Sequence, residues 1–451
     1  MKKNEEVSII GAGLVGSLLA VFLAKKGFTV SLFERRGDLR QENFSAGKSI
    51  NLALANRGIA AIEEAGLWSE VAPLLIPMRG RMLHDEKGVT NFQAYGSRDS
   101  EVIYSISRGK LNSVLLNAAE KAGVKIRFHH NVTDLDLETN TLLMKNPSGD
   151  KSYHFQRIFA ADGSGSKLRK ILAEKHQLLT QHQEEPLDHG YKELCMPAGA
   201  HGSFALEKEA LHIWPRGEYM LIALPNLDAS FTVTLFLRNK GLPSFETLNN
   251  AAECKEFFAA NFKDAVPLIP HLQEDFFKNP TGKLLTVKCA PWSFQDKLLL
   301  IGDAAHAIVP FHGQGMNCGF EDCSALNKCI EQEDSWVRVF SSFEDVRKAN
   351  SDAIADMALE NYLEMRSIVR DPQYQLKKQL AFSLEKKFPK RFIPRYSMVM
   401  FHCFPYSQAQ KRGIIQEQIL DSCTVGIKHL NEVDEKEVAG LVRERLTPLS
   451  F

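Results

Sequence analysis

A glycine-rich turn between a short strand and a helix places the tightest constraint on the fold of this chain. The apolar, strand-favouring run 7–10 is followed at once by Gly11-Ala12-Gly13-Leu14-Val15-Gly16. An apolar helical run, 17–26, comes next, and a second strand, 29–33, ends in Glu34. The order strand, G-x-G-x-x-G, helix, strand and acidic residue is typical of a βαβ unit that binds a dinucleotide.

Each part of this turn has a physical task. Gly11 would make the tight turn, Gly13 would let the backbone approach a pyrophosphate, and Gly16 would allow close helix packing. The helix N-terminus would offer unpaired N–H groups to the phosphates. Glu34 would accept hydrogen bonds from a ribose and repel a 2′-phosphate. The turn therefore predicts a site for FAD or NAD rather than NADP; the alternative is a glycine-rich turn in an ordinary α/β unit.

Two distant segments favour FAD over NAD. Phe159-Ala160-Ala161-Asp162-Gly163 follows a strand-like run and precedes a basic helical run, 167–175. Much later, 297–306 contains a buried-strand pattern that ends in Gly302-Asp303 at a helix-forming turn. Asp303 is the right chemical type to accept hydrogen bonds from the sugar-alcohol chain of FAD. A simple NAD dehydrogenase has no need of both segments. His306, beside this turn, is expected to be structural rather than a catalytic base.

The next segment, Pro310-Phe311-His312-Gly313-Gln314-Gly315-Met316-Asn317, enters a helical run that extends to Ile330. Its glycines would let the backbone pass close to a flat ring, and the helix N-terminus would stabilise a reduced flavin anion. The alternative is a plain helix-entry loop. Together with the N-terminal turn, these segments resemble the single-component FAD-dependent aromatic monooxygenases, which have the 4-hydroxybenzoate hydroxylase fold. The sequence has no second G-x-G-x-x-G between a strand and a helix, so a nicotinamide donor would bind transiently in a cleft.

Composition excludes several other classes of protein. The 451 residues carry 55 Lys+Arg and 55 Asp+Glu, so no overall basic charge exists to hold nucleic acid. The eight cysteines form no C-x-x-C pair, which argues against a disulfide framework or a zinc site. The N-terminal MKKNEE does not have the pattern of a signal peptide, and no run of about 18 apolar residues occurs. We therefore expect a cytoplasmic protein with no membrane span and no metal.

Further segments carry a more specific resemblance. They are Gly47–Leu54, Pro77–Met82, His212–Arg216, Ile301–Cys323, Asn361–Arg366 and Phe392–Val399. Together they resemble the kynurenine 3-monooxygenase family, over residues 6 to about 405. The resemblance implies hydroxylation of L-kynurenine to 3-hydroxykynurenine with FAD, NADPH and O2, by way of a C4a-hydroperoxyflavin. The substrate's amino group activates the ring carbon ortho to it, so no catalytic residue beyond the flavin is expected.

The resemblance also assigns residues to the site. Arg81 and Tyr95, joined by Asn361 and Tyr396, would bind the substrate carboxylate, since a guanidinium holds a carboxylate bidentately and a phenol adds a neutral donor. Without the resemblance, Arg81 would be interpreted as a surface arginine at a strand edge. Asn361 would be interpreted as a polar residue on a helix face, and Tyr396 as a half-buried aromatic residue. The FAD residues, with those of the glycine turn, would be Gly11, Gly13, Val15, Gly16, Glu34, Ala53, Arg108, Val132, Asp303, Pro310, Gly315, Met316 and Asn317.

The predicted fold class is α/β, with a Rossmann-like FAD-binding domain, an inserted antiparallel β-sheet substrate domain and C-terminal helices. The FAD-binding domain would occupy 1–175 and, after the substrate domain at 176–285, return over 286–375. A helical region, 376–451, would follow.

Two details of this architecture can be tested by the structure. In the insert, alternate residues share one face, as on a half-buried antiparallel sheet that would roof the substrate pocket; they are Phe231, Val233, Leu235 and Leu237. The last helix, about 432–446, would pack on the body of the protein through Val438, Leu441 and Val442.

Three alternatives to this function stay open. A hydroxylase of another aromatic substrate, such as a salicylate-like phenol, would keep the flavin motifs but need no amino-acid clamp. A flavin halogenase is disfavoured because no G-W-x-W-x-I-P segment is present. A non-enzymatic carrier of the same fold would not retain a flavin.

The C-terminal end departs from part of the family. Eukaryotic members end in a membrane-anchoring hydrophobic tail, which this chain, ending at Phe451, lacks. We therefore expect a soluble bacterial form. The sequence specifies neither the role of 406–451 nor the oligomeric state.

Overall fold

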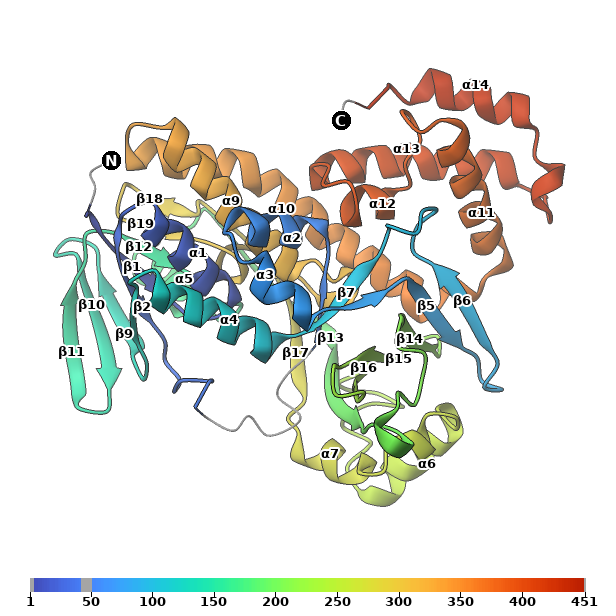
Figure 1. Cartoon of the computed structure of the whole chain (residues 1–451), viewed down its shortest axis with the longest axis horizontal. Coiled ribbons are helices and arrows are strands. Elements are labelled where there is room, and N and C mark those ends of the chain that lie inside the picture. The colour runs from blue at the N-terminus through green and yellow to red at the C-terminus, as the bar shows by residue number, and fades with distance from the viewer. Residues whose placement is uncertain (1–3, 42–50, 450–451) are drawn as a thin grey trace.

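A computed structural model describes residues 4–41 and 51–449 of the chain. Residues 47–50 of the segment Gly47–Leu54 therefore lie outside the described residues. Figure 1 shows three regions side by side: a Rossmann-like domain, a large sheet with two helices below it, and a group of C-terminal helices.

The Rossmann-like domain is built on a six-stranded sheet. Its strand order is β18-β19-β12-β1-β2-β8, and all neighbours are parallel except the edge strand β18. The strands are β1 Glu6–Ile10, β2 Thr29–Phe33, β8 Lys125–Arg127, β12 Ile158–Ala160, β18 Ser293–Phe294 and β19 Leu298–Leu300. The predicted strands 7–10 and 29–33 are confirmed. Helix α1, Leu14–Lys25, begins three residues earlier than predicted, because Gly13 has the extended backbone of an N-cap.

Helices and two small sheets complete this domain. The helices are α2 Asn56–Glu64, α3 Trp68–Val71, α4 Arg108–Lys121, α5 Lys167–Glu174, α8 Asp303–His306, α9 Gly315–Gln332 and α10 Trp336–Arg366. One small sheet has the order β11-β10-β9, and the other β3-β7-β4. Their strands are β3 Asn51–Leu54, β4 Ile76–Met78, β7 Ile103–Ser107, β9 Asn131–Asp136, β10 Thr141–Asn146 and β11 Gly149–His154. The long helix α10 starts in the core of this domain and ends beside the second sheet.

The second sheet has seven strands in the order β17-β13-β16-β15-β14-β5-β6. They are β5 Gly80–His84, β6 Thr90–Ala94, β13 Gln181–Met196, β14 Ala210–Pro215, β15 Met220–Pro225, β16 Phe231–Arg238 and β17 Gly282–Ala290. Every pairing is antiparallel except that of β14 with β5. The sheet therefore extends beyond the predicted insert: β5 and β6 come from the first segment of the chain, and most of β17 from the return.

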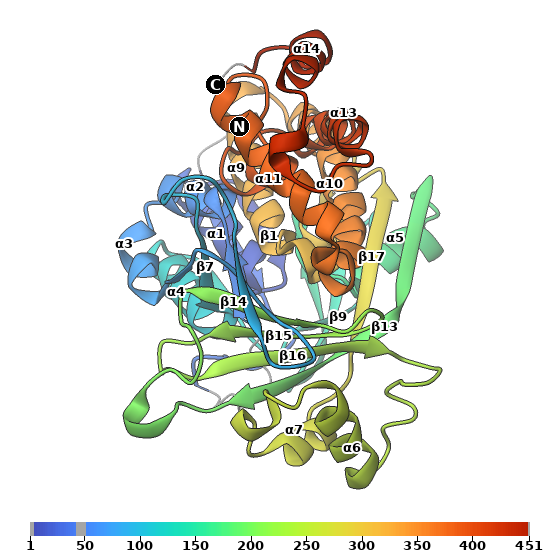
Figure 2. The ribbon, with the colours of Figure 1, turned by 90° about the vertical axis from the view of Figure 1, so that its right-hand side faces the viewer.

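Both faces of β16, an inner strand of this sheet, are buried. The four predicted face residues of β16, from Phe231 to Leu237, are fully buried against the cluster that includes α6, Ala251–Asn261, and α7, Leu272–Lys278. On the other face, Thr234 and Phe236 are only 4% exposed. The expectation of a half-buried strand is therefore wrong for β16. Figure 2 shows the reason: α6 and α7 lie on one side of the sheet and the helices of the C-terminal half on the other.

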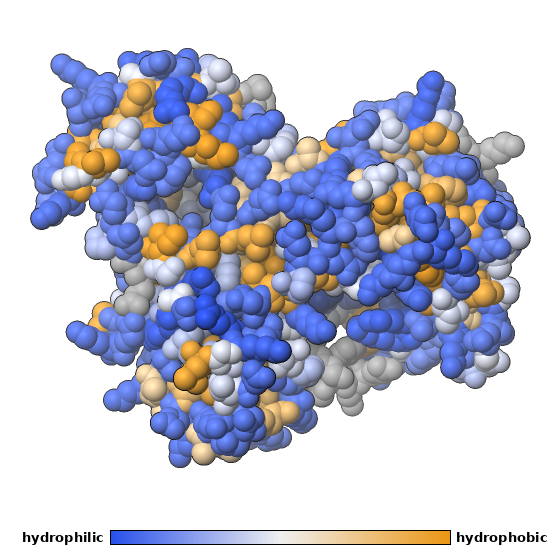
Figure 3. Space-filling model, turned by 180° about the vertical axis from the view of Figure 1, so that it is seen from behind, coloured by the Kyte–Doolittle hydropathy of each residue, from blue (hydrophilic) through white to orange (hydrophobic). Residues whose placement is uncertain are grey.

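The C-terminal region consists of four helices, α11 Pro372–Lys387, α12 Arg395–Met400, α13 Tyr406–Thr424 and α14 Glu435–Arg445. Helix α14 packs inward through Val438 and Val442, as predicted, against a cluster that contains Leu384 of α11 and Ile419 of α13. Among the described residues, no helix combines the length and apolar character needed to cross a membrane. The face seen in Figure 3 is mostly hydrophilic, with apolar residues in small separate groups.

Candidate active site

A cavity of about 530 Å³ lies between the two large sheets and the helices α10 and α12. One part of its wall follows the carboxyl ends of β1, β12 and β19, which is where parallel α/β sheets bind ligands. The inner face of the seven-stranded sheet, through side chains such as Thr234 and Phe236, forms a second part. Helices α10 and α12 close the far end with Asn361 and Tyr396.

The glycine turn is shaped for a phosphate. Gly11 has a φ of +105°, and a Cβ there would come within 2.4 Å of the Ala161 carbonyl oxygen. A Cβ on Gly16 would lie 1.9 Å from the Gly11 carbonyl oxygen, so only glycine fits either position. A Cβ on Gly13, by contrast, would meet no described atom within 4 Å and would project into open space. The first turn of α1 has no acidic residue, so its N–H groups suit an anion.

Polar groups follow the cavity away from this turn. Glu34 lies at the end of β2, and its Oε2 accepts a hydrogen bond from the Ala12 amide at 3.0 Å. Arg108 opens α4 and Asp303 opens α8, and both line the cavity. Burial raises the pKa of Asp303, while the charge of Arg108 acts to lower it. The cavity is thus lined by a carboxylate that can accept from a ribose, by a helix N-terminus and a guanidinium that can donate to phosphates, and by a second carboxylate. This set of polar groups fits FAD.

An aromatic cluster with a buried arginine forms the other end of the cavity. Residues alternate across β5, so Arg81 points into the cavity beside Leu211 of the neighbouring strand. Its guanidinium lies 5.8 Å from the Tyr95 ring centroid and 5.4 Å from that of Tyr396. The two phenol rings are stacked, with centroids 5.5 Å apart. Among the described residues, Arg81 Nε and the Tyr95 hydroxyl have no hydrogen-bond partner, so each is a buried polar group whose hydrogen bond is unmade.

The comparison with known proteins decides the family. The FAD binding domain family model matches residues 4–184 and 280–333. Kynurenine 3-monooxygenase from Myxococcus xanthus is 47% identical over 449 residues, which cover 99% of this chain and 96% of that protein. The enzyme of that name from Stenotrophomonas maltophilia is 45% identical over 448 residues, covering 99% of this chain and 98% of that protein. The chain belongs to the kynurenine 3-monooxygenase family.

Solved structures agree on the fold. 2-Methyl-3-hydroxypyridine-5-carboxylic acid oxygenase superposes with a TM-score of 0.67 at 19% identity, over 82% of this chain and 95% of that one. The predicted α/β fold class and the predicted FAD cofactor are thus both confirmed at the level of the family.

The structure places most of the residues assigned by the family resemblance on the cavity wall. All four expected substrate residues line it, together with Gly11, Gly13, Val15, Glu34, Ala53, Arg108, Asp303, Pro310, Gly315 and Met316. Val132 instead lines a small adjoining hollow that shares Gly11 and Glu34 with the main cavity. Gly16 does not line the main cavity; it packs α1 against the Gly11 turn.

Asn317 also lies behind the wall. Its side chain is fully buried, and Nδ2 donates to the carbonyl oxygens of Ala53 and Gly313, each at 2.8 Å. Oδ1 accepts from the Ala55 amide at 2.9 Å. Asn317 therefore ties the loop 310–316 to β3 rather than offering its own polar atoms to a ligand.

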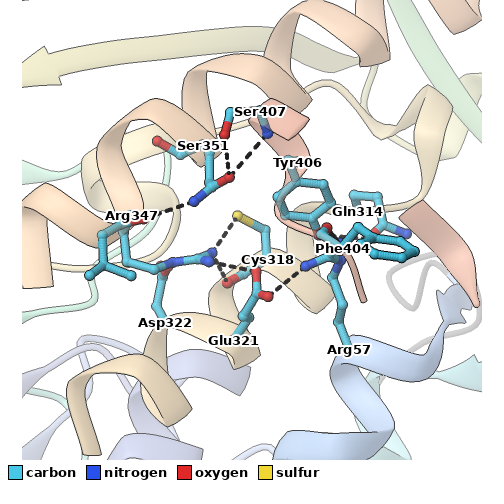
Figure 4. Close-up of polar contacts among 12 residues, drawn as sticks. Arg57, Gln314, Cys318, Glu321, Asp322, Arg347, Ser351, Phe404, Tyr406 and Ser407 are labelled. Atoms are coloured by element: carbon cyan, nitrogen blue, oxygen red, sulfur yellow. Dashed lines mark hydrogen bonds and ion pairs between the residues drawn. The ribbon is translucent and has the colours of Figure 1, made fainter. Parts of the chain in front are cut away.

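A polar network from the C-terminal helices braces this loop, as Figure 4 shows. The Tyr406 hydroxyl of α13 donates to Gln314 Oε1 at 2.7 Å, and Gln314 Nε2 lies 2.9 Å from the sulfur of Met400. Arg57 stacks over the Tyr406 ring at 3.8 Å. It shares the carboxylate of Glu321 with a second buried arginine of α10, so α2, α9, α10 and α13 are joined under the loop.

His306 takes part in a buried ion pair that is joined to this network through Arg347. Its Nε2 lies 2.7 Å from Asp322 Oδ2, and Arg347 Nε donates to the other oxygen of Asp322 at 2.7 Å. Although burial acts to lower the pKa of His306, the Asp322 carboxylate holds it well above the ordinary value. His306 does not line the cavity, which agrees with the structural role expected from the sequence.

Sequence reasoning missed the partner of Arg81. Glu364 of α10 accepts from Arg81 Nη1 at 2.9 Å and from the Tyr374 hydroxyl at 2.7 Å. Burial acts to raise the pKa of Glu364, but Arg81 and Tyr374 lower it, so the group is a carboxylate. The spacing Asn361-x-x-Glu364 places both side chains on one helix face and was the available clue. Tyr374 lies outside every recognised segment.

A neutral histidine completes this end of the cavity. The His312 ring stacks on Tyr396 with centroids 5.5 Å apart. Burial lowers its pKa to about 4, so the imidazole is uncharged at neutral pH. Asn361 Nδ2 donates to the Phe311 carbonyl oxygen at 2.6 Å, which fixes the residue before His312 against α10.

Proposed function

We propose that this chain hydroxylates L-kynurenine to 3-hydroxykynurenine, with FAD as its cofactor, NADPH as the transient electron donor and O2 as the oxidant. The observation that carries the proposal is the buried Arg81 at the end of the cavity, since its Nε and the Tyr95 hydroxyl have no hydrogen-bond partner in the described chain. Such a group recognises the carboxylate of an amino acid. In this proposal the enzyme works in the cytoplasm, where thiols are kept reduced.

The residues that would hold FAD are those along the cavity. The α1 N-terminus at Gly11 and Gly13, with Arg108, would hold the pyrophosphate, while Gly16 would keep α1 close to this turn. Glu34 would accept from the ribose and Asp303 from the sugar-alcohol hydroxyls. The remaining residues would enclose the cofactor: Val15, Ala53, Pro310, Gly315 and Met316 on the cavity wall, Val132 in the adjoining hollow and Asn317 behind the wall. Bound FAD would supply redox chemistry, taking electrons from NADPH and activating O2 so that one oxygen atom reaches the ring.

The chain's own residues would bind and orient the substrate. Arg81 and Tyr95 would bind its carboxylate, and Tyr396 with Asn361 would line the same end of the cavity. Because the substrate's own amino group activates the ring, no protein base is required. The protein's contribution is therefore position and the exclusion of water, where small displacements change rates by large factors.

The test is NADPH oxidation by the purified yellow protein, with and without L-kynurenine, combined with mass analysis of the product. Stimulated oxidation with the gain of one oxygen atom is the expected result. Stimulation without an oxygenated product would show that kynurenine is only an effector, in whose presence the enzyme releases peroxide. No stimulation in the flavin-loaded protein would discard this substrate, and a salicylate-like phenol would then be the next candidate.

A further inference from the structure

The charges at the carboxylate end of the cavity do not favour an anion by themselves. Arg81 is 5% exposed, and its guanidinium already donates to Glu364 at 2.9 Å. The two opposite charges cancel at this range. A substrate carboxylate that approached Arg81 would also be repelled by Glu364. Tight binding of a carboxylate here therefore needs a further positive charge.

Helix α11 supplies that charge. Tyr374 donates to Glu364 from the first turn of α11. Lys378 follows four residues later, so it lies on the same face of the helix as Tyr374. Within the described chain, Lys378 has no hydrogen bond or ion pair; its ammonium lies 5.9 Å from the Phe382 ring centroid. It is a partly buried cation without a fixed partner.

The electrostatics link Lys378 to the Arg81–Glu364 pair. The pKa of Lys378 is lowered to about 8, first by burial and then by the charge of Arg81, while the charge of Glu364 acts to raise it. The neighbouring phenols Tyr95 and Tyr374 have raised pKa values because of burial and are uncharged. The cluster thus holds two cations and one anion near neutral pH, a net charge of about +1.

We propose that Lys378 is a positioning residue for substrate binding. When a carboxylate binds to Arg81, the positive charge of the Lys378 ammonium balances the negative charge of Glu364 in place of Arg81. The inference rests on the proposed function, because it takes L-kynurenine as the carboxylate. It adds α11 to the elements that affect the substrate site, beside α12 with Tyr396. Lys378 acts through Glu364 and Arg81, since neither it nor Glu364 lines the cavity.

A pH dependence follows from this arrangement. A bound carboxylate favours the protonated form of Lys378, so affinity is full below a pH of about 8 and falls as the pH rises through that value. Arginine at this position would stay charged over the whole range, and methionine would carry no charge at any pH. The charged groups that act on Lys378 are Arg81 from β5 and Glu364 from α10.

The experiment measures the Kd of L-kynurenine for the oxidised, FAD-loaded protein without NADPH, from the change in flavin absorbance, between about pH 6.5 and 9.5. In the wild type, Kd is expected to rise about tenfold above pH 8. Lys378→Met should bind about tenfold more weakly already at neutral pH, with a flat profile. Lys378→Arg should bind tightly throughout. Titration of the substrate's own amino group would change all three proteins equally.

Two further readouts separate this role from a structural one. Lys386→Met removes an exposed ammonium from the same helix and is the matched control; its Kd should equal that of the wild type. For Lys378→Met, KM should rise while kcat at saturating substrate stays near the wild-type value. Removing a buried charge relieves its desolvation cost, so this variant is expected to fold, which the melting temperature and FAD content would verify.

Each contrary result has its own meaning. A Lys378→Met protein with the wild-type Kd and pH profile would overturn the inference and leave the proposed function standing. An equal loss of binding in Lys386→Met would overturn it as well, because a general charge effect would then suffice. A wild-type protein that binds no L-kynurenine would overturn the proposed function itself, and this inference with it.

Discussion

Replacing Arg81 by methionine tests the carboxylate site most directly. The change removes a buried guanidinium and keeps a side chain of similar length. A charge-assisted hydrogen bond contributes about 1.5–3 kcal/mol. The loss also leaves Glu364, now without its 2.9 Å partner, to repel the substrate carboxylate. Together we expect about 3–4 kcal/mol of lost binding, which is a rise in KM of about 10²–10³-fold.

The assay is steady-state, kynurenine-dependent NADPH oxidation, with FAD content measured on the same samples. FAD should stay bound, because Arg81 lies at the end of the cavity away from the glycine turn. Arg79→Met is the matched control: Arg79 lies two residues away, is 50% exposed and pairs with Glu209 on the surface. In the double variant Arg81→Met, Glu364→Gln, KM should fall part of the way back, since the repulsion is gone. An unchanged KM in the flavin-loaded Arg81→Met protein would refute the assignment.

Three other predictions address the cofactor, the brace and the pH response. Tyr406→Phe removes the hydroxyl that donates to Gln314 at 2.7 Å; it should cost about 1–2 kcal/mol of stability and release more peroxide per NADPH, whereas Tyr362→Phe, whose hydroxyl has no partner in the described chain, should cost little. Gly13→Val would fill open space in the cavity, so we expect a folded protein by circular dichroism that carries no flavin; a yellow variant would contradict the assignment. His312 has a pKa lowered from 6.5 to about 4, so its unfolded form binds the extra proton and stability should fall as pH drops through this window, by up to about 3 kcal/mol. In His312→Asn, the melting temperature should depend less on pH between about 4 and 6.5. An equal pH dependence in the wild type and the variant would argue against a lowered pKa of His312.

The nucleotide-binding half was predictable because its patterns are local. A strand, a glycine turn and an acidic residue at fixed spacing specify a βαβ unit without reference to the rest of the chain. Asp303 was located in the same way, by the end of a buried strand. The seven-stranded sheet was only partly predictable: the alternation in β16 indicated a strand, but nothing local could show that β5 pairs with β14 across about 130 residues of chain.

The substrate end depended on resemblance for its assignment and on packing for its geometry. Arg81, Tyr95, Asn361 and Tyr396 come from four separate elements, and their roles in binding remain predictions that the structure makes specific by placing them on one wall. Glu364 was passed over although it stands three residues from Asn361. A helix face can be inferred from spacing, but the partner of that face cannot.

The sequence by itself determined that this chain binds a dinucleotide through a Rossmann-like unit and that it resembles one family of flavin monooxygenases. Only the tertiary structure decided the charge balance around Arg81. Glu364 reaches it from α10, and Tyr374 and Lys378 approach from α11. Charges interact through space according to distance and burial, and neither quantity is present in the order of residues along the chain.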